Sequence, residues 1–182
     1  MTRVSAADSN LLLLASDAEA NIPGRVWNGY ICTNLEYFKH TNLPNTMTAE
    51  QGTRENPWKL KTSPQTAGYE MYRAEKDGQE ILVCVVGKTV LHYDYRCIQD
   101  LHDMLIKHGD WMELGAADEQ KPAKEGTVEA WGRSAQNSVG GWYGLKKGLR
   151  GRFGRYLPPL MEALGLAEVE YNARNNRMRA IQ

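Results

Sequence analysis

The residues of strongest chemical character are the cations near the C-terminal end of the chain. Five of them fall between positions 146 and 155, interleaved with glycines and aromatic residues: Lys146, Lys147, Arg150, Arg152 and Arg155. Lysine and arginine neutralise backbone phosphates, aromatic rings stack on bases, and glycines let two backbones approach closely. The pattern predicts a surface that contacts nucleic-acid phosphates. The alternative is a solvated face whose aromatic rings turn into the core.

A second basic group lies in the terminal segment Ala167–Ile181. Apolar and polar residues alternate there on both sides of an asparagine-rich stretch, which predicts a β-hairpin. Arg174 falls at the turn and is predicted to extend the nucleic-acid contact. Arg177 and Arg179 share one strand face, and two alternatives stay open for them. They either join this surface or pair with the glutamates of the facing strand.

Charge is unevenly distributed, although the chain is neutral overall. From Arg133 onward there are nine lysines and arginines against three acids, whereas the preceding part has thirteen against nineteen. An acidic body with a basic end indicates an anionic partner. We therefore expect the C-terminal cations to gather in one outward-facing patch.

Motifs for other kinds of chemistry are missing from the sequence. The four histidines show no HExxH and no paired spacing with cysteines, and there is no GxSxG or GK[ST] segment. An acid–base mechanism on a phosphate compound would need a histidine beside the basic residues, and nothing in the sequence brings one there. No catalytic residue, metal ligand or cofactor is predicted.

The 182 residues are enough for one domain with its own core. We expect a partly ordered N-terminal extension over residues 1–55 and a single α+β domain over residues 56–182. An odd number of cysteines without a CxxC pair favours a reducing cytoplasm over a disulfide framework. No apolar run approaches the roughly 20 residues of a membrane span, so no membrane contact is expected. A homodimer stays open.

The domain is expected to begin with an antiparallel β-meander over residues 69–93. Alternating and β-branched segments are separated there by turn residues, of which Asp77-Gly78 is the strongest pair. Apolar residues at helical spacing then predict a helix over residues 95–108. Asp94 is the expected N-cap of this helix, and Gly109 is expected to end it.

Shorter elements complete the expected order. A short strand is predicted over residues 111–114 and a short helix, capped by its first residue, over residues 127–131. A further helix is predicted from Pro158 to Leu164, because prolines suit the first turn of a helix. The segment Phe153–Leu157 is expected to be a separate or kinked lead-in. The hairpin then closes the chain.

This order of helix, short strand, short helix, helix and hairpin resembles a winged helix-turn-helix module over residues 94–182. The segment ALGLAEVEYNARNNRMRAI resembles its end, where a helix leads into a two-stranded wing. The resemblance implies that the helix at about residues 152–164 is the recognition element and that the hairpin is the wing. The segments GTVEAWGRS and GGWYGLKKGLRGRFGRYLPPLMEALGLAEVE also resemble a small bacterial family of uncharacterised proteins, with which no activity is associated.

The sequence thus predicts a cytoplasmic nucleic-acid-binding protein without catalytic activity, with DNA as the expected target. Two alternatives stay open. One is a protein-interaction module that docks an acidic partner through the basic C-terminal region. The other is an enzyme that acts on an anionic, phosphate-containing substrate.

Overall fold

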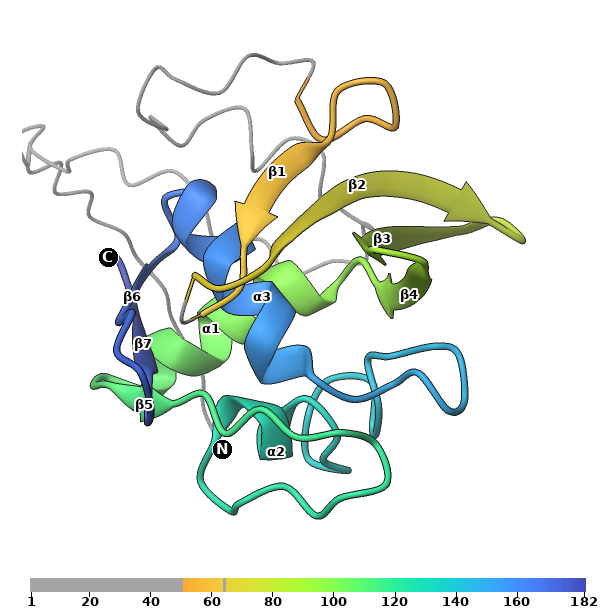
Figure 1. Cartoon of the computed structure of the whole chain (residues 1–182). Helices are drawn as coiled ribbons and strands as arrows, with labels where there is room; N and C mark the ends of the chain where they lie inside the picture. Colours follow the sequence, from red (N-terminus) through yellow and green to blue (C-terminus); the bar gives the residue numbers. More distant parts are fainter. Residues whose placement is uncertain (1–50, 64) are drawn as a thin grey trace, which may run out of the picture. The chain divides into compact units, whose positions relative to one another are not determined.

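A four-stranded antiparallel sheet forms the first part of the fold (Figure 1). The structure is a computed structural model that describes residues 51–63 and 65–182, all within one structural unit, Asn42–Gln182. The expectation of an N-terminal extension falls largely on residues 1–50, which lie outside the described residues.

The strands of this sheet lie side by side in chain order, as a meander requires. They are β1 (Trp58–Lys61), β2 (Gly68–Lys76), β3 (Gln79–Val86) and β4 (Thr89–Asp94). The predicted meander is therefore confirmed, and β1 adds one strand at its edge. The β2–β3 turn uses Asp77 and Gly78 with φ of 53° and 75°, the left-handed conformation that an Asp-Gly turn adopts.

Residues 51–55 pack on this sheet, although they were predicted as part of the extension. The carbonyl of Gly52 accepts a hydrogen bond from the Arg73 amide at 2.8 Å, and Gly52 is buried beside Trp58. The sheet thus fixes the chain at least from residue 51 onward.

Helix α1 (Cys97–His108) begins two residues later than predicted. The Asp94 carboxylate accepts from the Arg96 amide at 3.0 Å, so it stabilises the turn before the helix and does not cap it. Gly109 ends the helix with φ of 73°, as expected. Of the predicted apolar stripe, Ile98, Leu101 and Leu105 are buried and Met104 is half-buried.

Helix α3 (Phe153–Ala163) is one continuous helix, so the prediction of a start at Pro158 is wrong. Pro158 and Pro159 lie inside the helix, where each removes one backbone hydrogen bond. Both prolines are among the eight of eleven α3 residues that are buried, and this apolar packing offsets the lost hydrogen bonds. Gly165 follows with φ of 72°, as a left-handed helix end requires.

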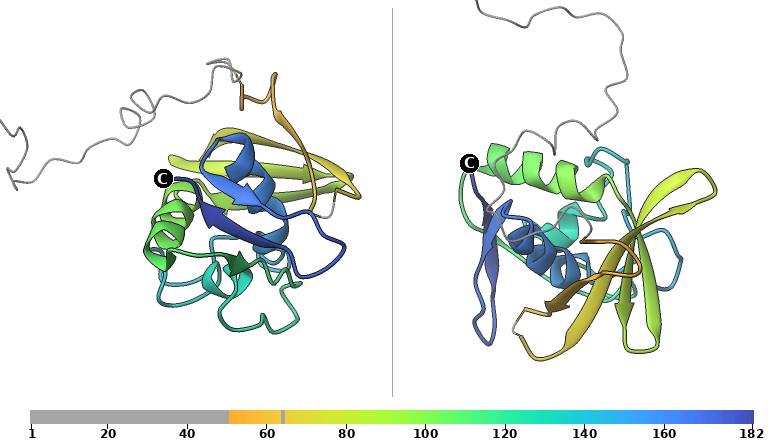
Figure 2. Two further views of the ribbon diagram at one scale, coloured as in Figure 1. Left: turned by 90° about the vertical axis from the view of Figure 1, so that its left-hand side faces the viewer. Right: turned by 90° about the horizontal axis from the view of Figure 1, so that it is seen from above.

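A second, three-stranded sheet lies on the other side of α3 from the meander (Figures 1 and 2). It consists of β5 (Met112–Glu113), β7 (Arg177–Ala180) and β6 (Ala167–Val169), in that order across the sheet. The short helix α2 (Val128–Trp131) begins at its predicted cap, Thr127, whose hydroxyl accepts from the Ala130 amide at 3.2 Å. The class is α+β, and the order of elements after the meander is the predicted one.

Candidate nucleic-acid interface

The start of α3 carries two of the predicted cations and is organised by a buried carboxylate. Glu129 of α2 is fully buried and accepts from the amides of Gly154 at 2.7 Å and Arg152 at 3.1 Å. Arg152 has φ of 65° and does not cap the helix with its own side chain. Glu129 therefore caps α3 from another element, where a negative charge suits the helix dipole.

Glu129 also pairs with Arg133 one turn further along the chain. Burial raises the pKa of Glu129, and the hydrogen bonds from Arg133 and Gly154 oppose that rise. The guanidinium of Arg133 lies over the Trp142 ring at 4.4 Å. The carboxylate and its arginine thus form one buried unit between α2 and the start of α3.

The same guanidinium fixes the recognition loop, our term for residues 116–126. Arg133 donates to the carbonyl oxygens of Ala117 and Lys121, both at 3.0 Å. The Arg152 amide donates to the Ala117 carbonyl at 2.8 Å. The path of this loop is therefore held in large part through its main-chain carbonyl groups.

Two glycines of the basic segment allow the recognition loop and its neighbours to approach α3. A Cβ on Gly154 would lie 2.2 Å from the Leu114 carbonyl oxygen, and one on Gly151 would lie 2.4 Å from the Glu119 amide nitrogen. The close backbone approach expected at glycines of the basic segment thus occurs within the chain at these two positions. These glycines serve close packing within the chain, because no side chain fits at either position.

Two adjoining cavities of about 540 and 280 Å³ lie between the recognition loop, the start of α3 and the hairpin turn. Arg155 lines both of them. We call these two cavities together the cationic groove. Five cations line it: Lys121, Lys124, Arg152, Arg155 and Arg174.

The two acids that line the cationic groove are both paired. Lys124 bonds Glu113 at 2.6 Å, and the Nε of Arg152 bonds Asp118. The pKa of Asp118 lies below its usual range because Arg152 donates to it, and the charges of Lys121 and Arg155 lower it further. The groove therefore holds three more positive than negative charges, and its potential favours anions.

The structure brings only some of the predicted residues together. Arg152, Arg155 and Arg174 line the cationic groove, although Arg152 is also bound by Asp118. Lys146 and Lys147 are exposed on a different loop and line neither cavity. The expectation of one patch is therefore wrong, because the loop that carries Lys146 and Lys147 lies between α2 and α3, beside β4, whereas Arg174 lies in the turn between β6 and β7.

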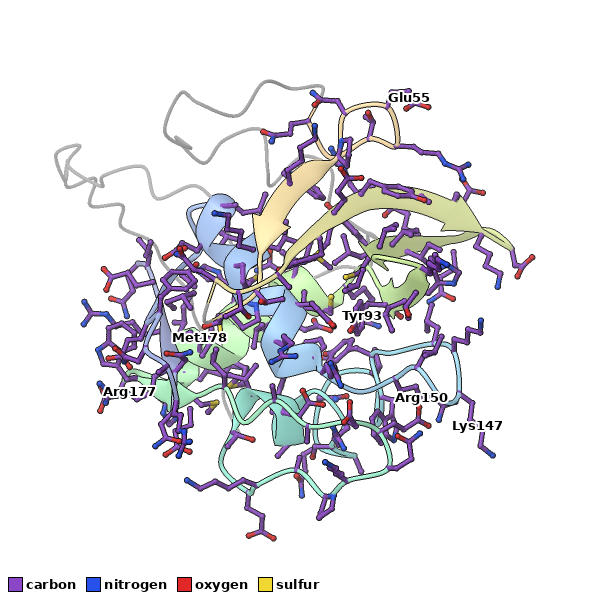
Figure 3. All side chains as sticks on the ribbon, in the orientation of Figure 1. Glu55, Tyr93, Lys147, Arg150, Arg177 and Met178 are labelled. Carbon is purple, nitrogen blue, oxygen red and sulfur yellow. The ribbon has the colours of Figure 1, made fainter. Side chains whose placement is uncertain are left out.

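Figure 3 shows this separation at the labelled residues. Lys147 and Arg150 lie on one side of the molecule, and Arg177 of the hairpin lies on the other. Arg150 is half-buried, and its amide donates to the Glu119 carboxylate at 2.9 Å. Arg150 thus helps to hold the recognition loop in place.

Arg177 and Arg179 are neutralised within the hairpin, which was one of the two alternatives. Arg177 bonds Glu170 at 2.6 Å, and Arg179 bonds Glu168 at the same distance. Both guanidinium groups also lie over the Trp111 ring, at 5.4 and 4.8 Å. These cations are therefore not part of the cationic groove.

Lys121 and Lys124 are groove residues that the sequence argument missed. The charged stretch around them looks like an ordinary solvated loop, because its acids and bases alternate. The position of this stretch in the fold depends on hydrogen bonds from the Arg133 side chain to its main-chain carbonyl groups, and Arg133 is distant in the sequence. A local pattern carries no signal for such a contact.

The helix that the winged-module resemblance offers as a recognition element has no free face. Eight residues of α3 are buried, and the helix contacts β1, α1, α2 and β6. A helix that reads DNA must expose one side to the groove. The implied role of α3 is therefore wrong, because beyond the half-buried cations at its start only Glu162 and Ala163 at its end are exposed.

Other chemistry finds no support among the described residues. No group of three His, Cys, Asp or Glu side chains there is arranged to hold a metal ion. Burial, with the charges of Lys76 and Lys146, lowers the pKa of His92, but this side chain does not line the cationic groove. Within residues 51–63 and 65–182, no helix has the length and apolar character needed to cross a bilayer.

The fold and this site define an α+β protein with an anion-attracting groove. The chain belongs to DUF6855, a family of unknown function, whose model matches residues 50–181. That match covers almost all of the described part. No curated protein and no solved structure matches the chain.

Proposed function

We propose that this protein binds nucleic acid through backbone phosphates held in the cationic groove, without catalysing a reaction. The observation that carries the proposal is the excess of positive charge there, with Lys121, Arg155 and Arg174 outside any ion pair with the described residues. Arginine and lysine that contact phosphates release counterions, which gives affinity without sequence preference. DNA is the expected target.

The experiment is a titration of fluorescently labelled DNA and RNA over a salt series, comparing the wild type with the double variant Arg155→Glu/Arg174→Glu. Both side chains line the same cavity and neither is buried, so the variant is expected to fold. We expect affinity at low salt to fall at least about tenfold. The slope of log K against log salt should become shallower by about 0.7–0.9 for each lost contact.

The matched control is Lys76→Glu/Lys107→Glu. It makes the same change in net charge at exposed positions that line none of the cavities. Its affinity should stay close to that of the wild type. Equal losses in the two double variants would mean that net charge alone drives binding, and an unchanged affinity in the groove variant would refute the proposal.

An acidic protein partner is the second candidate, and the same cavities favour it only through their charge. Two results together would favour a protein partner. The protein would fail to bind DNA or RNA at low salt, and it would bind an acidic peptide in a way that Arg155→Glu abolishes. As part of the main proposal we place the protein in the cytoplasm, where the free, buried Cys84 and Cys97 would stay reduced.

A further inference from the structure

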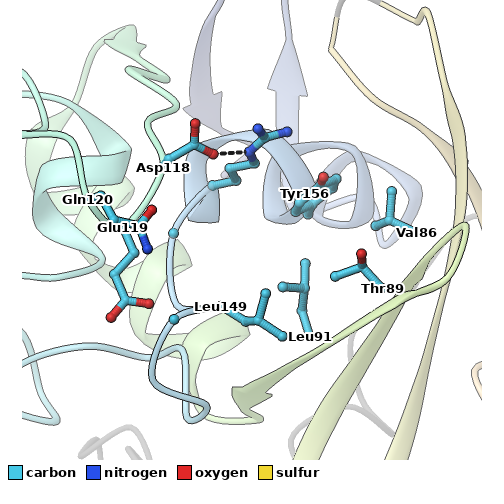
Figure 4. Close-up of a pocket in the computed structure, with 11 residues that line it drawn as sticks. Val86, Thr89, Leu91, Asp118, Glu119, Gln120, Leu149 and Tyr156 are labelled. Carbon is cyan, nitrogen blue, oxygen red and sulfur yellow. Dashed lines mark hydrogen bonds and ion pairs between the residues drawn. The ribbon is translucent and has the colours of Figure 1, made fainter.

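A third cavity, of about 300 Å³, lies on the far side of the Arg152–Asp118 ion pair from the cationic groove. Figure 4 shows its apolar wall, to which the ends of β3 and β4, the 148–151 loop and α3 each contribute. The apolar lining consists of Val86, Leu91, Leu149 and Tyr156. We call this cavity the side pocket. Its size is at the lower end of the roughly 300–1,000 Å³ typical of sites for small organic groups.

The polar rim of the side pocket is rich in hydrogen-bond acceptors. Asp118, Glu119 and Gln120 of the recognition loop line it. The carboxylate of Glu119 accepts one bond, from the Arg150 amide at 2.9 Å, and a carboxylate has room for several. Arg152 offsets one of the two carboxylates, and a phosphate or carboxylate ligand would still meet a net negative charge here. The rim suits a flat, uncharged group that donates hydrogen bonds.

Asp118 and Arg152 line both the side pocket and the cationic groove. A strand whose phosphates lie in the groove therefore passes directly beside the pocket. Nucleic-acid bases have an apolar face, and all except thymine and uracil carry an amino group. In base recognition, carboxylates accept hydrogen bonds from such amino groups. Bases that are free of a duplex enter such pockets most readily.

We propose that the side pocket receives one unstacked base of a single strand, with Asp118 and Glu119 accepting from its amino group. This inference rests on the proposed function and specifies its ligand: single-stranded nucleic acid is preferred to duplex. The buried state of α3 agrees with this choice, because α3 exposes no face that could enter a duplex groove.

The test compares binding of a single strand, its duplex and an abasic strand of equal length, which keeps the phosphates and removes the bases. We expect the single strand to bind about tenfold more tightly than the abasic strand. The variant Thr89→Trp should fill the side pocket and remove this difference while leaving abasic binding unchanged. Thr89 is exposed at the start of β4, where a large aromatic residue is tolerated.

Val90→Trp is the matched control. Val90 is the next residue of β4, it is exposed, and it does not line the side pocket. It should keep the preference for the base-bearing strand. A second variant, Glu119→Gln, keeps an oxygen for the Arg150 amide and should reduce the preference for cytosine over thymine in homopolymeric strands several-fold.

The outcomes separate this inference from the proposed function. If no strand binds, both fail. If the abasic strand binds as tightly as the single strand, the groove binds phosphates and the side pocket has no role. A base preference that survives both Thr89→Trp and Glu119→Gln would also overturn the inference. The same series with RNA of identical sequence tells which sugar the strand carries, and a base preference with either one supports the proposal.

Discussion

Replacing Glu129 with alanine should destabilise the domain more than a change at any exposed charge. The carboxylate is fully buried, it pairs with Arg133, and it caps α3 through the amides of Arg152 and Gly154. Its removal leaves the Gly154 amide without this acceptor and a largely buried guanidinium without its counter-charge. Breaking a buried ion pair from one side costs about 3–5 kcal/mol.

Thermal and urea unfolding followed by far-UV circular dichroism would measure this loss. A loss of about 3–5 kcal/mol lowers Tm by roughly 10 °C or more in a domain of this size. Glu129→Gln is the milder partner variant. Its amide oxygen can still accept from Gly154, and burial already disfavours the charged form of Glu129.

The reasoning would be refuted by an alanine variant whose free energy of unfolding lies within about 1 kcal/mol of the wild type, since that is the scale of an ordinary substitution. It would also be refuted if glutamine proved more damaging than alanine. The pair Glu129→Ala and Arg133→Met, alone and combined, gives the coupling energy between the two residues.

Two further predictions concern the same region. Gly154→Ala should lower the free energy of unfolding by more than about 2 kcal/mol, because its Cβ would overlap the Leu114 carbonyl oxygen. The control Gly141→Ala, with no atom within 4 Å of its Cβ, should stay near the wild type. Equal effects of the two substitutions would contradict the packing argument. The raised pKa of Glu129 means that the native state keeps a proton that the unfolded state releases above pH about 4.5. The stability advantage of the wild type over Glu129→Gln should therefore shrink as the pH rises from about 4.5 through the raised pKa of Glu129. Denaturant unfolding over this pH range measures it. An advantage that grows with pH would mean that pairing with Arg133 outweighs burial.

The elements that local rules govern could be predicted from the sequence. Asp77-Gly78 forms its turn, Thr127 caps its helix, and Gly109 ends α1, because each of these depends on residues a few positions apart. The hairpin follows from alternation for the same reason, whereas alternation left pairing with the facing glutamates as only one of two alternatives for Arg177 and Arg179.

The start of α3 could not be predicted in this way. Its first amides are satisfied by Glu129, which lies in another helix, so Phe153 needs no capping residue before it. Prolines are common in the first turn of a helix. Pro158 and Pro159 lie in the middle of α3 instead, where their burial stabilises the helix. The position of Arg155 and the shape of the cationic groove depend on the same long-range contact.

The cations could be named from composition, but their grouping could not. Arg155 and Arg174 line one cavity because the hairpin turn returns to the start of α3, while Lys147 lies on the loop between α2 and α3, on the other side of the molecule from the hairpin. Spacing along the chain gives no measure of either distance.

Arg133, just after the end of α2, has a consequence for which substitutions the 116–126 loop can tolerate. Arg133 donates hydrogen bonds to main-chain carbonyl oxygens of the recognition loop, and every residue type has a main-chain carbonyl. The outward side chains at positions such as Gln120, Lys121 and Lys124 can therefore change without altering the path of the loop. The charge of the outer surface of this loop can therefore vary while its main chain keeps the same path.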